Sequence, residues 1–175
     1  FPSPILPNED VSLPLYLYDA ANAWDANWNM VGNPYLSYYD MDSISDFFYP
    51  IIAWNGTGYD TYRPGDDVYH FKPLEGFFIQ NANLSQVTLP ISGRETRTEA
   101  NTKLADSHSL RKVMAAAPAE KEARKLINLT LSSATYTDRT RVVFNANASL
   151  EYEIGVDANK FISSSAPVQL YSLGK

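Results

Sequence analysis

Cysteine is absent from this chain of 175 residues. Its absence excludes a disulfide framework, a thiolate nucleophile and any zinc site built on cysteine. A chain of this length buries roughly 70% of the surface of its unfolded form, so it needs neither a disulfide nor a metal to fold. The sequence also has no apolar run of about 18 residues, the minimum for a membrane-spanning helix, so we expect no membrane span.

Basic residues are scarce in the first half of the chain. Residues 1–93 hold two of them, Arg63 and Lys72, against eleven acidic residues, a balance of −9. Residues 94–175 hold twelve basic and nine acidic residues, a balance of +3, which gives −6 for the whole chain. The acidic half also holds 18 of the 23 aromatic residues. Because such a surface repels phosphate backbones, we expect no nucleic-acid partner and favour a glycan or a protein ligand.

Short segments with β-strand character follow one another along most of the sequence. Turn signals separate them, mostly at intervals of 8–12 residues, which indicates a sandwich or jelly roll and not a parallel α/β fold. The clearest signal is Asn55-Gly56, because both residues tolerate positive φ. Residues 40–48 predict a short helical turn with Asp42 or Ser43 as its cap. The expected strands are 13–18, 28–31, 49–54, 59–63, 68–71, 76–80, 86–91, 125–132, 140–145, 150–156, 160–163 and 168–173.

The composition changes over residues 94–124, which are rich in Ala, Thr, Glu, Lys and Arg. We expect a polar, flexible connector here, with a surface helix over residues 109–117 as the alternative. The sequence thus predicts a single all-β domain over residues 1–175, an antiparallel, jelly-roll-like β-sandwich. Two halves of the sequence, 13–93 and 125–173, form it.

Residues suited to nucleophilic catalysis are few. The sequence has no Gly-x-Ser-x-Gly elbow, and its two histidines lie in a strand segment (His70) and in the connector (His108). A Ser-His-Asp site needs a histidine within reach of both partners, so we interpret both histidines as structural or surface residues. A glycosidase pair of carboxylates stays open as an alternative. Its candidates are Asp40, Asp42, Asp46, Asp60, Asp66, Asp67 and Glu75.

Three of these carboxylates, Asp40, Asp42 and Asp46, fall within seven residues. Calcium favours such clusters of hard oxygen ligands, but the central Gly and closing Glu of an EF-hand are missing. We interpret the cluster as a solvated acidic turn. No spacing of His, Asp and Glu resembles a zinc or iron site, so the sequence predicts no catalytic residue, no metal site and no cofactor.

Aromatic side chains are the best candidates for ligand binding. Trp24 lies in a polar turn, and Tyr59 and Tyr62 lie between the turn at Gly58 and Arg63. Exposed rings beside Asp and Asn suit sugars, because C–H faces stack on a ring while polar groups bind the hydroxyls. We therefore predict a ligand-binding platform of Trp24, Tyr59 and Tyr62 on one face. The alternative is packing between the sheets, which we favour for Trp28, Trp54, Phe77 and Phe78.

Seven short motifs occur in order along the chain. They are 28–34 (WNMVGNP), 54–59 (WNGTGY), 73–79 (PLEGFFI), 129–131 (LTL), 140–144 (TRVVF), 152–160 (YEIGVDANK) and 167–173 (PVQLYSL). Together they resemble a β-sandwich module near the C-terminal end of secreted and surface proteins of Bacteroidetes-type bacteria. The resemblance implies export and a sorting domain beyond this sequence, but no activity. Asp42-Ser43-Ile44 also matches the O-glycosylation pattern of these bacteria, and the 94–124 segment departs from the commonest form of the module.

These observations favour a non-enzymatic, extracellular interaction or accessory module of a larger bacterial protein, with adhesion as one such role. Because the chain begins at Phe1 with no leader, we expect its export signal to have been removed. The alternatives are a carbohydrate-binding module, a structural spacer before a sorting domain, and a small glycoside hydrolase. The oligomeric state stays open.

Overall fold

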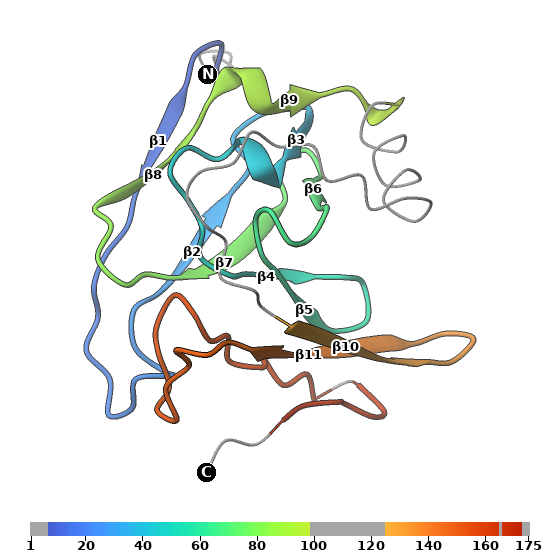
Figure 1. Ribbon diagram of the computed structural model, residues 1–175. Coiled ribbons are helices and arrows are strands. Elements are labelled where there is room, and N and C mark those ends of the chain that lie inside the picture. The colour runs from blue at the N-terminus through green and yellow to red at the C-terminus, as the bar shows by residue number, and fades with distance from the viewer. Residues whose placement is uncertain (1–6, 99–124, 165, 173–175) are drawn as a thin grey trace.

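The chain folds into antiparallel β-sheets, as the sequence predicts. The computed structural model describes residues 7–98, 125–164 and 166–172 (Figure 1). Within these ranges a four-stranded sheet has the order β2-β7-β4-β5, a three-stranded sheet has the order β6-β3-β9, and β1-β8 and β10-β11 form pairs. The strands are β1 (Val11–Pro14), β2 (Trp28–Gly32), β3 (Tyr38–Asp40), β4 (Ile51–Trp54), β5 (Tyr59–Tyr62), β6 (His70–Phe71), β7 (Gly76–Gln80), β8 (Gln86–Leu89), β9 (Arg94–Glu95), β10 (Lys125–Ser132) and β11 (Thr137–Phe144).

The hydrophobic core lies between the four-stranded sheet, the three-stranded sheet and the β1-β8 pair, in a sandwich-like arrangement. Alternation along each strand sends every second side chain inward. Phe77 of β7 stacks on Phe71 of β6 with ring centroids 4.1 Å apart, and Tyr39 of β3 stacks on Tyr35 at 5.7 Å. The rings of Tyr39, Phe71 and Phe77 are fully buried. Aromatic residues therefore supply much of the apolar area that stabilises the fold. Of the described helical segments, none is long and apolar enough to cross a membrane.

Phe161, from the second half of the chain, packs on part of the other face of the four-stranded sheet, where Met30 stays 71% exposed. Phe161 lies against Trp28 of β2, Tyr59 of β5 and Phe78 of β7, with centroid distances of 4.7, 5.5 and 5.1 Å. The β10–β11 hairpin lies beside β5 (Figure 1), where Arg139 Nη2 donates to the carbonyl oxygen of Thr61. These contacts join the two halves of the sequence in space.

Asparagine side chains close two corners of the chain. Asn33, next to Pro34, is buried and hydrogen-bonds three backbone groups around it. The Asn55-Gly56 turn forms as predicted but not with positive φ at both residues, because of the two only Gly56 has positive φ, at 104°. Asn55 instead closes the turn with its side-chain oxygen, which accepts from the backbone N–H groups of Thr57 and Gly58. That arrangement is an Asx turn and not a type I′ turn.

Several predicted strands are wrong. Residues 15–18 are not strand, and the three expected strands after residue 149 are irregular over their described residues, apart from a single bridge between Ile154 and Asp157. Asp157 ties that loop by accepting from the backbone N–H of Glu153 at 2.9 Å. Two strands that the sequence analysis did not predict, β3 and β9, are three and two residues long. Strands this short give no readable periodicity.

The helical turn and the connector also need correction. The turn is a 3₁₀ helix, η1 (Met41–Ser43), and its cap is Asp40, whose carboxylate accepts from the N–H of Asp42. A second 3₁₀ helix, η2 (Ile91–Gly93), precedes β9. Because β9 occupies 94–95, the predicted connector begins too early. Residues 99–124, including His108 and the alternative helix over 109–117, lie outside the described residues.

Buried tyrosines predict a loss of stability at alkaline pH. Burial, aided by Asp60, raises the pKa of Tyr62 from 10.0 to about 12, and burial likewise raises that of Tyr152 to about 12. Above pH 10 the unfolded chain loses these protons while the folded chain keeps them. The free energy of unfolding should therefore be unaffected by these groups below pH 10 and should fall between pH 10 and 12. Urea unfolding at intervals of pH, with tyrosinate absorbance, measures this effect.

Tyr62→Phe is the matched variant for this experiment. It removes the hydroxyl but keeps the ring, so the decline of stability above pH 10 should become shallower. Equal slopes in the two proteins would contradict the assignment of the decline to Tyr62.

Candidate functional site

The three predicted platform residues do not share one face. Tyr59 and Tyr62 are three positions apart on β5, so strand alternation sends their side chains to opposite sides of the sheet. Tyr59 packs edge-on against Trp54 at 5.0 Å, within the aromatic cluster around Phe161. Tyr62 lies on the core side, 4.1 Å from the ring of Tyr69. The prediction that Trp24, Tyr59 and Tyr62 form one platform is therefore wrong.

Trp24 differs from these two tyrosines. It lies in the irregular segment before β2 and its side chain is 46% exposed. Its backbone carbonyl is held in place by the indole N–H of Trp28, which donates over 2.8 Å. Trp24 is therefore an accessible ring on an anchored backbone, but it lacks Tyr59 and Tyr62 as partners.

Two of the acidic residues proposed for a glycosidase pair, Asp60 and Asp67, are engaged in a structural network. Arg139 from β11 lies over the ring of Tyr62, with its guanidinium carbon 4.3 Å from the ring centroid, and its nitrogens are 3.8 Å from carboxylate oxygens of Asp60 and Asp67. Arg141 forms an ion pair with Asp67. These contacts attach the hairpin to the turn after β5, so they favour a structural role for both carboxylates.

Two further carboxylates from that candidate set are also tied to local structure. Glu75 accepts from the hydroxyl of Tyr69 at 2.7 Å and from the N–H of Lys72 at 2.7 Å. Asp42 accepts from the N–H of Gly65 at 2.8 Å. Hydrogen bonds of this kind are the usual reason for Asp and Glu in turns.

The outer face of the β10–β11 hairpin carries an exposed apolar row. Ile127, Leu129 and Leu131 alternate along β10, and each is between 38% and 47% exposed. Pairing in register places Phe144 on the same face, opposite Lys125. At the end of this face close to the hairpin turn, Asp138 contacts Lys160 and the backbone of Leu170. The alternation in the sequence predicts β10 as a strand, but no motif in it marks this face as a site.

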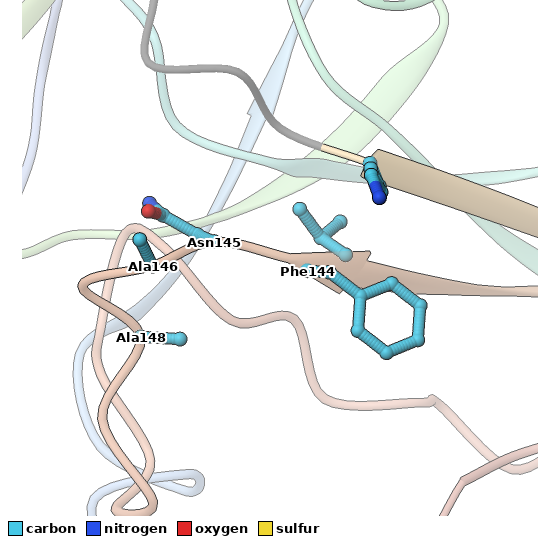
Figure 2. A pocket seen from close by; sticks show the side chains of 6 residues that line it. Phe144, Asn145, Ala146 and Ala148 are labelled. Carbon is cyan, nitrogen blue, oxygen red and sulfur yellow. The ribbon is translucent and has the colours of Figure 1, made fainter.

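A shallow, open depression lies at the other end of this hairpin. Figure 2 shows Phe144, Asn145, Ala146 and Ala148 around it, and Lys125 and Val143 complete the lining. The lining offers an exposed ring and small side chains but one titratable group, Lys125. It therefore suits contact with apolar groups better than acid–base chemistry.

A second cluster was missed by the sequence analysis. Asp40, His70 and Glu95 each offer one potential ligand atom, and these atoms lie within 4.8 Å of one another. They come from the three neighbouring strands β3, β6 and β9. As a potential metal ligand, Asp40 is therefore grouped with His70 and Glu95 and not with Asp42 and Asp46. Because the three residues are 30 and 25 positions apart, only the strand pairing brings them together.

Comparison of the chain with protein-family models, with curated proteins and with solved structures finds no match. The resemblance to the bacterial β-sandwich module therefore stays a prediction from the seven motifs.

Proposed function

We propose that this chain is a non-enzymatic interaction module of an exported bacterial surface or secreted protein. Its ligand is a protein that docks on the outer face of the β10–β11 hairpin. The observation that carries the proposal is the exposed apolar row of Ile127, Leu129 and Leu131. Contiguous exposed apolar surface is costly in a soluble protein and commonly marks an interaction site.

The free edge of β10 gives the partner a second point of attachment. The β10–β11 pair is a two-stranded sheet, so among the described strands β10 pairs only with β11. An open edge exposes backbone N–H and C=O groups that an extended segment of another chain can pair with. Strand addition of this kind uses backbone hydrogen bonds for affinity and apolar side chains for specificity. The proposed ligand is therefore a protein with an extended, apolar segment.

The experiment is a binding screen of the fluorescently labelled chain on arrays of proteins and of glycans. The test variant replaces Ile127, Leu129 and Leu131 by threonine, which preserves strand propensity but removes apolar area. Thr130→Ser is the matched control, because Thr130 is an exposed residue on the opposite face of the same strand. We expect protein hits that the triple variant weakens at least about tenfold and that Thr130→Ser leaves unchanged. Absence of protein hits, or hits that survive in the triple variant, would contradict the proposal.

The exposure of Trp24 supports carbohydrate binding as the second candidate function. Aromatic rings accessible to solvent bind the apolar faces of sugars. The glycan arm of the same screen, with Trp24→Ala, tests it. Glycan hits lost in Trp24→Ala would favour this candidate, whereas a blank on both arrays would favour a structural spacer.

A further inference from the structure

The strand register places three potential metal ligands on one face of the β6-β3-β9 sheet. His70 of β6 lies directly opposite Asp40 of β3. Glu95 of β9 lies opposite Tyr38, and alternation puts Tyr38 and Asp40 on the same face. Glu95 thus extends across the central strand until its Oε2 is 2.6 Å from Nδ1 of His70. The geometry points to a binding site for one divalent metal ion, formed by Asp40, His70 and Glu95.

His70 is the residue that most needs a further partner. Its side chain is 1% exposed, and neither ring nitrogen forms a directed hydrogen bond within the described part of the chain. The short contact with Glu95 has the distance of an ion pair but not the direction of a hydrogen bond. A buried imidazole without such a partner is costly, and native proteins satisfy almost all such groups. A metal ion between the imidazole and the carboxylates would satisfy the ring.

The donor set defines the class of ion. One imidazole nitrogen and two carboxylate oxygens suit divalent ions such as the borderline Zn²⁺ and the harder Mn²⁺ and lack the all-oxygen shell of Ca²⁺. Among these ions the Irving–Williams order favours Zn²⁺ over Mn²⁺. Zinc also accepts three protein ligands with a fourth position left for water. We therefore expect Zn²⁺ to bind more tightly than Mn²⁺, and both more tightly than Ca²⁺.

A neighbouring hydrogen bond holds one ligand in position. One carboxylate oxygen of Asp40 accepts from the N–H of Asp42 at 3.1 Å, at the start of η1. Such second contacts orient a ligand before the ion binds. The proposed ion would connect β3, β6 and β9, a different sheet from the hairpin that carries the proposed protein-binding face. A negative result for the metal site would therefore leave the proposed protein binding untouched, and the reverse also holds.

The test is calorimetric titration of the EDTA-treated full chain with ZnCl₂, MnCl₂ and CaCl₂. We expect one Zn²⁺ per chain and a rise of the thermal midpoint with added Zn²⁺. Glu95→Gln and Asp40→Asn each keep the size of the side chain but remove its charge. Each should weaken Zn²⁺ binding at least about tenfold. Glu151→Gln, which changes an exposed glutamate, and His108→Gln should bind as the original chain does.

A measurement on the unsubstituted chain guards against variants that fail to fold. Addition of Co²⁺ should shift the ring resonances of one histidine strongly in NMR spectra, and His108→Gln should keep those shifted resonances, which assigns them to His70. No saturable Zn²⁺ binding, equal binding by Glu95→Gln and Asp40→Asn, or shifted resonances that His108→Gln removes would each overturn the inference.

Discussion

Replacing Asp138 by alanine is expected to lower the free energy of unfolding by about 3–5 kcal/mol, the usual cost of breaking a buried ion pair. The Asp138 side chain is 1% exposed and forms an ion pair with Lys160. Its second oxygen accepts from the N–H of Leu170 at 2.7 Å. The ammonium of Lys160 also donates to the carbonyl oxygen of Tyr59. The substitution therefore leaves a cation that is only 15% exposed without its counter-ion and removes an anchor of the C-terminal segment.

A double-mutant cycle with Lys160→Met measures this effect by chemical denaturation. Methionine keeps the apolar stem of lysine, so the double variant should lose much less stability than the sum of the single variants. Hydrogen exchange should show faster exchange at Leu170 in Asp138→Ala than in the unsubstituted chain. Asp25→Ala, at an exposed position, is the control and should change stability by no more than about 0.5 kcal/mol. The prediction would be contradicted if Asp138→Ala lowered the free energy of unfolding only slightly and the two single substitutions had additive effects.

The same ion pair explains why the end of the chain was predicted as strand but is irregular. Residues 160–163 and 168–173 have β-branched and aromatic residues at strand-like density, which is what propensity detects. Their backbone groups instead hydrogen-bond to side chains. Leu170 N–H donates to Asp138, and the amide side chain of Gln169 bonds both the N–H and the carbonyl of Ser163. Hydrogen bonds to a residue far away in the sequence, or to a side chain and not to a neighbouring strand, leave no periodic signal in the sequence.

The strands that the sequence predicts well are those whose alternation is long enough to read. β10 has the predicted bounds, and β2 and β7 match to within a residue, because their apolar alternation is clear. β11 is as long as β10 but begins three residues before its predicted start at 140. The odd spacing of Tyr59 and Tyr62 also carried information: residues three apart on a strand cannot form one platform. By contrast, the grouping of Asp40, His70 and Glu95 depends on the order β6-β3-β9, which no local pattern specifies.

Replacing Asn33 by alanine is expected to lower the free energy of unfolding by at least about 3 kcal/mol, since each buried group left without a partner costs about 1–3 kcal/mol. Asn33 is 2% exposed. Its amide nitrogen donates to the carbonyl oxygens of Ser37 and Lys72, both at 2.9 Å, and its oxygen accepts from the N–H of Tyr35 at 3.0 Å. One side chain thus joins the corner after β2 to the end of β6, and alanine would leave all three backbone groups without it.

Asn33→Asp separates the hydrogen bonds from the shape of the side chain. Aspartate has the same size and can still accept from Tyr35, but it cannot donate to the two carbonyl groups and adds a buried charge. It should therefore be no more stable than Asn33→Ala, whereas Asn22→Ala at an exposed position should change stability by at most about 0.5 kcal/mol. Denaturant unfolding of the three variants measures the difference. An Asn33→Asp variant as stable as the original chain would show that the donor bonds to Ser37 and Lys72 contribute little, and that the corner is held by Pro34 and the hydrogen bond to Tyr35 instead.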